Sequence, residues 1–208
     1  MKCFAAERST YSATLTVPDD VPPTYVGNYV GIWWVLETKV AVRMARDLKA
    51  KTAVFVLAPF PEDPSYLLTN LPQQAKGNCA LEFSLPTVVL KQGQILEGKL
   101  SVQAVRDTDV RELRVELRRV EAVFKGPLMI WDVVPEDSTV LATHFKLPGG
   151  LTQTYDVSFH VSSAHYQPTV ATHAGVAFWE LAAILDHGRS RKCSATQPLV
   201  IYNSEGRS

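Results

Sequence analysis

The side chains of this sequence that could do chemistry are its five histidines, its three cysteines and a few adjacent acidic pairs. His160, His165 and His173 follow one another at spacings of five and eight residues, without the closer pairs and cysteines that are typical of a zinc site. Asp186 and His187 could belong to a hydrolytic triad, but no serine stands in a Gly-x-Ser-x-Gly setting. The histidines are therefore better explained as exposed or structural side chains, and the Asp-His pair as the tip of a hairpin.

The acidic and basic clusters lie in segments that are typical of turns. The pairs at 19–20 (Asp-Asp) and 62–63 (Glu-Asp) stand beside prolines, where acids serve turns more often than they bind calcium. The basic residues at 189–192 indicate a solvated hairpin turn rather than a phosphate site. Neither a P-loop nor a Gly-x-Gly-x-x-Gly sequence is present. The sequence predicts no catalytic residue, no metal site and no cofactor, so an enzyme is the least favoured class.

The three cysteines are Cys3, Cys79 and Cys193. An odd number without Cys-x-x-Cys spacing argues against a disulfide framework and predicts free, buried thiols in a reducing compartment. The first eight residues contain no apolar run before Glu7, so we expect no signal peptide. No stretch of about 18 apolar residues is present. We therefore expect a cytoplasmic protein that does not span a membrane.

Length and charge restrict the class further. The 208 residues suffice for one large domain or two small ones, and 46% of them are hydrophobic, as in a globular protein with a true core. Lys and Arg together number 21, as do Asp and Glu, so the formal net charge is zero. This balance gives no electrostatic reason to expect a nucleic acid or an anionic membrane as partner.

The strongest pattern in the sequence is a segment that occurs twice. A Pro-Thr pair, a Trp-x-Leu triplet and an apolar run keep the same spacing in both copies over about 35 residues, which predicts one all-β module written twice in tandem. The shared features are Pro23-Thr24, Trp34 to Leu36 and residues 54–57, which return 145 positions later as Pro168-Thr169, Trp179 to Leu181 and residues 199–202.

Each copy also contains a segment with good helix propensity, at 41–51 and at 179–185. Hairpins are favoured there, because each segment begins in a β-branched or aromatic run between a proline-rich segment and another apolar strand. If Trp34 faces inward on its strand, Trp33 points outward beside Tyr29. We take Tyr29 and Trp33 as a candidate protein-contact surface, with burial of Trp33 between domains as the alternative.

Residues 80–124 alternate as strands of an antiparallel sandwich do. Leu113, Val115 and Leu117 alternate with charged residues, which predicts one buried face and one solvated face. We further expect a strand at 11–17, a helical turn at 65–71 and a hairpin or irregular edge at 125–142. Three prolines between 59 and 64 mark a boundary. The expected units are a partial N-terminal sandwich (1–58), a linker (59–78), a C-terminal sandwich (79–203) and a tail (204–208).

Several of these motifs resemble those of proteins with the arrestin fold. Residues 90–102 are similar to the family's Gly-Glu-x-Ile-x-Gly-x-Leu-x-Val opening, and 110–120 resemble the strand after it. Residues 145–161 resemble its Phe-x-Leu-Pro strand, and both copies of the repeat resemble its Pro-Pro-Ser/Thr-Tyr-x-Gly segment. The family includes arrestins, α-arrestins, a retromer subunit and bacterial sporulation-control proteins. The resemblance implies two tandem antiparallel β-sandwiches in a non-enzymatic scaffold or adaptor for trafficking or signalling.

The first copy departs from this pattern, because only about 20 residues precede its Pro-Thr pair, whereas the second copy is preceded by residues 80–124. The first sandwich is therefore expected to lack strands, which lie upstream of this sequence or come from another chain. An open strand edge favours a protein or peptide partner bound by strand addition, or a homodimer. The alternative function is an immunoglobulin-like structural or adhesion module, against which the free cysteines and the missing signal peptide count.

Overall fold

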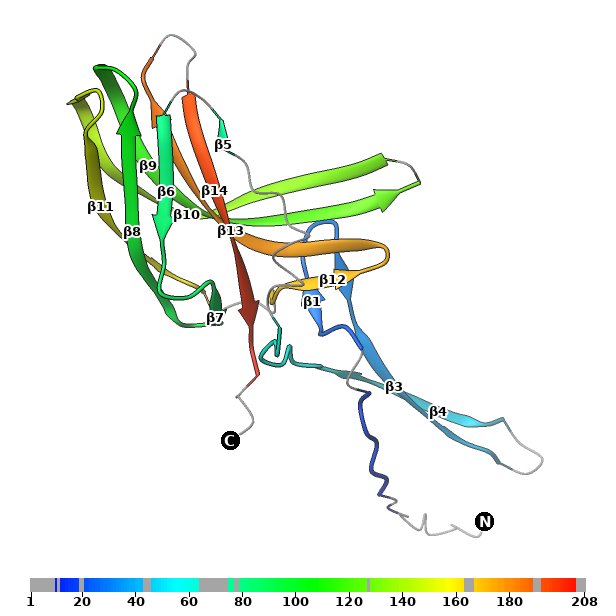
Figure 1. The fold of residues 1–208 in the computed structure, drawn as a ribbon. Helices are drawn as coiled ribbons and strands as arrows, with labels where there is room; N and C mark the ends of the chain where they lie inside the picture. Colours follow the sequence, from blue (N-terminus) through cyan, green and yellow to red (C-terminus); the bar gives the residue numbers. More distant parts are fainter. Residues whose placement is uncertain are drawn as a thin grey trace, which may run out of the picture.

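The computed structural model describes residues 10, 12–18, 21–42, 46–63, 75–76, 79–126, 128–162, 167–188 and 192–204. The regular elements of these residues are all β-strands, which confirms the expected all-β class (Figure 1). In chain order they are β1 (Tyr25–Val26), β2 (Gly31–Ile32), β3 (Trp34–Val40), β4 (Leu48–Val54), β5 (Ala75–Lys76), β6 (Cys79–Ser84), β7 (Val89–Lys91), β8 (Ile95–Ala104), β9 (Thr108–Lys125), β10 (Leu128–Leu147), β11 (Thr152–His160), β12 (Val170–Thr172), β13 (Gly175–Asp186) and β14 (Lys192–Tyr202).

The second module is a sandwich of two sheets. Its larger sheet has the order β10-β9-β13-β14-β5, with β12 beside β13 and β7 parallel to β14. The smaller sheet, β11-β8-β6, covers one face of the larger one (Figure 1). Alternate residues of both sheets fill the space between them, including Leu113, Val115 and Leu117 as the sequence predicts. The largest fully buried side chains of this core are Leu90, Leu96, Leu100, Leu113, Leu117, Leu147, Trp179, Leu181, Leu185 and Leu199.

Of the two alternatives expected at 125–142, the hairpin is confirmed, because the described residues of this range belong to one long hairpin. β10 pairs with β9 from Leu128, opposite Lys125, to Leu147, opposite Thr108. The register shifts between Pro135 and Asp137, so that the proline is accommodated at an irregularity of an edge strand. The tip of the β9–β10 hairpin extends beyond the smaller sheet (Figure 1). Asp132 of β10 contacts Asn28 of the first module.

The first module consists, in the described residues, of the hairpins β1–β2 and β3–β4. Both have the register of their counterparts in the second module, which confirms the predicted repeat. Of the two segments with helix propensity, the described part of 41–51 forms strand at 48–51 and no helix, and 179–185 forms strand throughout. The residue pairs, each 145 positions from its counterpart, are Tyr25–Ile32 and Trp34–Val54 in the first module and Val170–Ala177 and Trp179–Leu199 in the second.

The expectations for the strand at 11–17, the linker at 59–78 and the helical turn at 65–71 have different outcomes. No strand forms at 12–17, where none of the described strands pairs with the chain. β5 lies inside the expected linker but pairs with β14 at Ser194 and Ala195, so this piece belongs to the sheet of the second module. The helical turn expected at 65–71 lies outside the described residues. The described part of the chain contains no helix with the length and apolarity needed to cross a membrane.

Candidate protein-interaction surface

The two copies of the repeated segment make the same tryptophan contact. The indole Nε1 of Trp34 donates a hydrogen bond to the carbonyl oxygen of Pro22 at 3.0 Å. The indole Nε1 of Trp179 donates to the carbonyl oxygen of Gln167, the counterpart of Pro22, at 2.8 Å. The twelve-residue distance between the carbonyl group and the tryptophan therefore lets each indole N–H, its only hydrogen-bond donor, find an acceptor in the preceding segment.

A threonine clamp is repeated in the same way. Thr24 donates its backbone N–H to the carbonyl oxygen of Val56 at 2.8 Å and accepts the N–H of Val56 on Oγ1 at 2.9 Å. Thr169 makes both bonds with Ile201, at 2.7 and 2.9 Å. The threonine hydroxyl thus replaces a backbone acceptor and ties the segment before each hairpin to the chain at the end of the second strand, just beyond β4 in the first module and within β14 in the second.

The two copies differ in what surrounds them. β13 lies between β9 and β14, and Trp179 is only 1% exposed. β3 pairs with β4 alone among the described strands, and nearly all residues of both strands are exposed. Since the local geometry is the same, β3 is exposed because no further strand of the described residues lies beside it, and not because its local fold differs.

The unpaired edge of β3 can be assigned residue by residue. On β14, the backbone N–H of Val200 donates to the carbonyl oxygen of Val88, beside β7. Because backbone groups of successive residues in a strand point to opposite edges, those of the preceding residue, Leu199, point toward β13. Leu199 lies opposite Trp179, and the equivalent pair in the first module is Val54 with Trp34. Trp34 therefore directs its backbone groups toward β4. The next residue, Val35, and alternate residues after it direct theirs toward the open edge.

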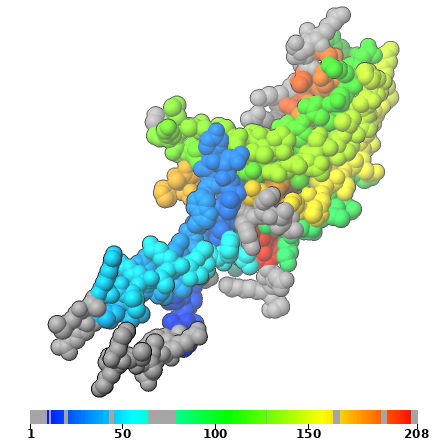
Figure 2. Space-filling model, turned by 180° about the vertical axis from the view of Figure 1, so that it is seen from behind, coloured from blue at the N-terminus to red at the C-terminus, as the bar shows by residue number. Residues whose placement is uncertain are grey.

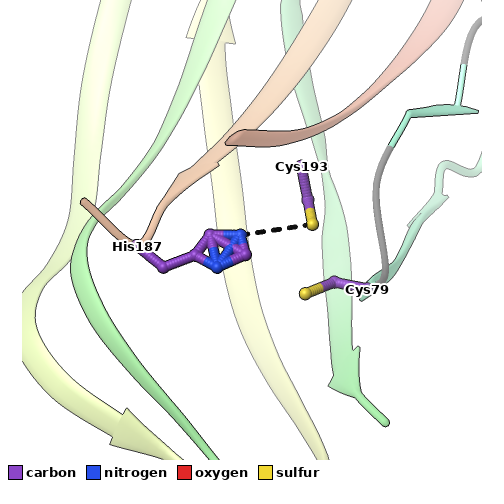
Figure 3. A group of neighbouring side chains, drawn as sticks. All are labelled: Cys79, His187 and Cys193. Carbon is purple, nitrogen blue, oxygen red and sulfur yellow. Dashed lines mark hydrogen bonds between the residues drawn. The ribbon is translucent and has the colours of Figure 1, made fainter. Parts of the chain in front are cut away.

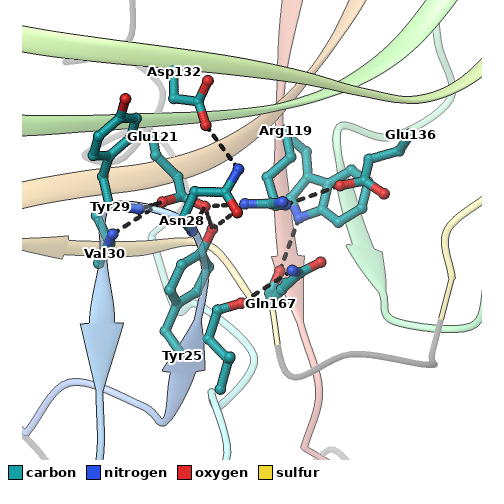
Figure 4. A network of polar contacts seen from close by, with 11 residues as sticks. Tyr25, Asn28, Tyr29, Val30, Arg119, Glu121, Asp132, Glu136 and Gln167 are labelled. Carbon is teal, nitrogen blue, oxygen red and sulfur yellow. Dashed lines mark hydrogen bonds and ion pairs between the residues drawn. The ribbon is translucent and has the colours of Figure 1, made fainter.

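A buried polar cluster attaches the first module to the second (Figure 4). Its centre is Glu121 of β9, whose side chain is 0% exposed. Glu121 Oε2 accepts the backbone N–H groups of Tyr29 at 2.7 Å and Val30 at 2.9 Å, and Oε1 accepts that of Asn28 at 3.1 Å. The Tyr25 hydroxyl donates to the same Oε1 at 3.1 Å, so one carboxylate of the second module holds the whole β1–β2 turn.

Arg119 completes the cluster. Its guanidinium pairs with Glu121 through Nη1 and with Glu136 of β10 through Nε, the latter at 3.0 Å, and its Nη1 also donates to the Tyr25 hydroxyl at 3.3 Å. Burial by itself would raise the pKa of Glu121, but the three backbone N–H groups and the charge of Arg119 outweigh it and hold that pKa below its ordinary value. Burial raises the pKa of Tyr25, which stays a neutral donor.

Further contacts join the modules outside this cluster. Gln167 Nε2 donates to the carbonyl oxygen of Val26 at 3.0 Å, and Asn28 Nδ2 donates to Asp132 Oδ2 at 2.8 Å. The backbone N–H of Ala58 donates to Asn203 Oδ1 at 2.7 Å. Ala58 and Asn203 are equivalent positions of the repeat, so the second strands of the two modules meet where each one ends.

The predicted contact residues Tyr29 and Trp33 both have exposed side chains, at 55% and 69%. The backbone of Tyr29 is fixed on Glu121 while its ring points away from the cluster, and the ring of Trp33 lies over Gly31. In Figure 2 the β1–β2 hairpin (blue) lies against the second module, and the β3–β4 hairpin (cyan) projects from the body of the molecule. Other large apolar side chains exposed on the first module include Val35, Leu36, Val40, Leu48, Val54, Phe55 and Leu57.

The charged face of β9, expected to be solvated, lines a hollow of about 640 Å³ on the outer side of the larger sheet. Arg114 and Arg118 form ion pairs there with Glu116, at 2.6 Å each, and their side chains are largely buried. Burial raises the pKa of Glu180, although Arg118 opposes this shift. Because these charged side chains pair with one another, the hollow is lined by neutralised ion pairs and does not present an unpaired charged patch to a ligand.

The expectation that the sequence holds no metal site rested on spacing along the chain. The structure brings Cys79, His187 and Cys193 together, although the first two lie 108 positions apart. Burial and the adjacent Cys193 thiol raise the pKa of Cys79 to about 12, so that this thiol is protonated and weakly nucleophilic at neutral pH. His160 and His173 lie on other strands and turns, and His165, Cys3 and the Asp pair at 19–20 lie outside the described residues.

Comparison with known proteins adds evidence on the fold alone. No protein-family profile matches the chain, and no curated protein is similar to it in sequence. Among solved structures, the sporulation control protein Spo0M from Bacillus subtilis superposes with a TM-score of 0.51 at 13% sequence identity, over 62% of this chain. The chain spans about half of the Spo0M chain, since the match covers 51% of it. The likeness supports the arrestin-like, all-β sandwich fold that the sequence motifs resemble.

Proposed function

We propose that this chain is a non-enzymatic, arrestin-like scaffold that binds a protein partner by strand addition along β3. The observation that carries the proposal is that β3 has the register of β13 but, among the described strands, no neighbour where β13 has β9. An open edge offers a row of backbone donors and acceptors, and here it adjoins exposed apolar side chains. As further parts of the proposal, we expect the scaffold to act in the cytoplasm, in the regulation of transport or signalling.

The chemistry of the partner strand follows from β9. On β9, Leu117 lies opposite Leu181 and Val115 lies opposite Ala183, and all four side chains face the core. A strand that takes this place beside β3 would run antiparallel to it and carry apolar residues at alternate positions. Those side chains would lie opposite Leu36 and Thr38, the counterparts of Leu181 and Ala183, and their contact would reduce the present exposure of Leu36.

A pair of proline variants tests this edge. The N–H of Val35 points toward the open edge of β3, and by the same alternation the N–H of Lys49 points to the outer edge of β4. Val35→Pro and Lys49→Pro should therefore each remove one outward donor while leaving the β3–β4 bonds intact. We expect Val35→Pro to weaken partner binding about tenfold or more, and Lys49→Pro to leave it within about twofold.

Binding would be measured by quantitative mass spectrometry of proteins retained from native lysate by the full chain and by each variant. Light scattering of the purified chain detects a second copy as the partner. Retention of the same proteins in the same amounts by the native chain and by Val35→Pro, together with unchanged self-association, would exclude strand addition at β3. Equal losses in both variants would point to general damage of the hairpin and would equally count against the proposal.

A further inference from the structure

Three side chains that can bind metal meet at the end of the second sandwich opposite to the first module (Figures 1 and 3). Cys79 begins β6 in the smaller sheet, Cys193 lies near the start of β14 in the larger sheet, and His187 lies in the turn between β13 and β14. The cluster therefore spans both sheets of the sandwich. It is separate from the β3 edge and from the polar cluster around Glu121.

The turn after β13 explains how His187 reaches Cys193. The last residue pairs of the hairpin are Leu185 with Cys193 and Asp186 with Lys192. Beyond them, Asp186 Oδ1 accepts the backbone N–H of Gly188 at 2.9 Å, and Gly188 has a φ of 70°, which favours glycine. This turn directs the imidazole back over the hairpin, where Nε2 of His187 lies 3.4 Å from Sγ of Cys193.

The distances suit one ion. The two sulfurs and a ring nitrogen all lie within 4.8 Å of one another. With Zn–S of about 2.3 Å and Zn–N of about 2.0–2.1 Å, tetrahedral ligand atoms stand about 3.5 Å apart, close to the separation of His187 and Cys193. Cys193 is buried while Cys79 and His187 are half-buried, so an ion there would be reached from solvent on one side only.

We propose that Cys79, His187 and Cys193 bind one Zn²⁺ ion. Binding would release the protons of both thiols to solvent, and the resulting two thiolates and an imidazole are ligands that zinc prefers over the oxygen ligands of Mg²⁺ and Ca²⁺. Three protein ligands leave the fourth tetrahedral position to water or to a side chain of a bound partner. Because Cys79 and Cys193 belong to different sheets, the ion would also cross-link the sandwich at this end.

The test uses the full chain, reduced and freed of metal with a chelator. Zinc chloride is titrated in competition with a chromogenic zinc chelator, and native mass spectrometry counts the ions bound. We expect one Zn²⁺ per chain, and a thermal unfolding midpoint that rises with zinc concentration. Cys79→Ser and His187→Asn should each lower the affinity at least about a hundredfold, since removal of a direct ligand costs more than that of an outer-sphere group.

Matched controls use the remaining residues of the same types. Cys3→Ser and His173→Ala should each bind zinc as the native chain does, since His173 is exposed outside the cluster and the proposed ligands do not include Cys3. Cys193→Ser places a hydroxyl in a buried position and could unfold the chain, so the decision rests on the half-buried Cys79 and His187. Co²⁺ provides a second readout, because the thiolate-to-cobalt absorption should be much weaker in Cys79→Ser, which retains only the thiolate of Cys193.

Two results would overturn the zinc site. One is zinc binding by the native chain that is no tighter than that of the double variant Cys79→Ser/His187→Asn. The other is a Cys79–Cys193 disulfide in the purified protein, found by mass spectrometry without reduction, together with no zinc uptake once the bond has been reduced.

Discussion

Replacing Glu121 by alanine should release the first module from the second. The carboxylate is fully buried and accepts three backbone N–H groups of the β1–β2 turn, from Asn28, Tyr29 and Val30. It also accepts the hydroxyl of Tyr25 and pairs with Arg119. The variant would leave all of these donors, one of them a charged guanidinium, without their common acceptor.

The magnitude follows from the number and kind of these bonds. A hydrogen bond to a charged group contributes about 1.5–3 kcal/mol, and removing one partner of a buried ion pair costs about 3–5 kcal/mol. The turn can regain hydrogen bonds from water by detaching, so the loss is limited by the free energy of docking. We therefore expect the docked state to lose about 3–5 kcal/mol, which corresponds to at least a hundredfold change in its equilibrium constant.

Hydrogen exchange read by mass spectrometry measures this loss locally. Amides of residues 25–32 should exchange at least about a hundredfold faster in Glu121→Ala, while those of 96–117 in the sandwich core keep their protection. Glu121→Gln retains the shape and one acceptor oxygen and should show a smaller effect. Glu112→Ala, on the same strand but partly exposed beside Arg114, should change either segment by less than about 1 kcal/mol.

Exchange of residues 25–32 that stays within about twofold of the native rate in Glu121→Ala would refute the assignment of Glu121 as the docking acceptor. An equal acceleration in 96–117 would refute it as well, because it would make Glu121 a part of the sandwich core rather than of the attachment.

Two further predictions concern the same attachment. The folded-state pKa of Glu121 lies below its ordinary value of about 4.5. The ionised carboxylate therefore stabilises docking fully above that pH, and this stabilisation is lost as the pH falls through the lower folded-state pKa. Protection of residues 25–32 against hydrogen exchange, corrected for intrinsic rates, should fall in this acidic range in the native chain and much less in Glu121→Gln. A Cβ on Gly27 would come within 2.6 Å of Tyr25 Cε1 and closer still to the Glu121 carboxylate. Gly27→Ala should therefore weaken docking by about 1–3 kcal/mol, measured by urea unfolding or hydrogen exchange. Asn28→Ala, which removes an exposed hydrogen bond to Asp132, should cost less than about 1 kcal/mol in the same measurement.

The repeat could be predicted from sequence because its spacing is a physical requirement. The distance from Pro22 to Trp34 places the indole Nε1 on a carbonyl oxygen, and the same distance returns between Gln167 and Trp179. Register in a hairpin follows from the turn and the side-chain alternation, which are both local. The strand assignments therefore held even where helix propensity was high.

The polar cluster was missed, although the sequence contains a signal for it. The apolar face of β9 carries Leu113, Val115 and Leu117, and the same alternation continues into Arg119 and Glu121. Two charged residues at core-facing positions of one strand predict that something other than the opposite sheet covers that end. What covers it, the β1–β2 turn more than 90 residues earlier, depends on tertiary structure that strand patterns do not contain. The cluster of Cys79 with His187 was missed for the same reason.

The way in which the first module is attached bears on how β3 can bind a partner. The attachment consists mainly of directional hydrogen bonds to the β1–β2 turn, with a small apolar cluster around Tyr25 and Val30. The exposed residues of β3 and β4 take little part in it. A strand added to β3 would thus form its bonds without breaking those of Glu121, and docking and partner binding should be separable. Glu121→Ala should loosen the turn while leaving the β3 edge open, and Val35→Pro should block the edge while leaving the turn protected. Variants that failed to separate in this way would mean that the hairpin and its anchor form one cooperative unit.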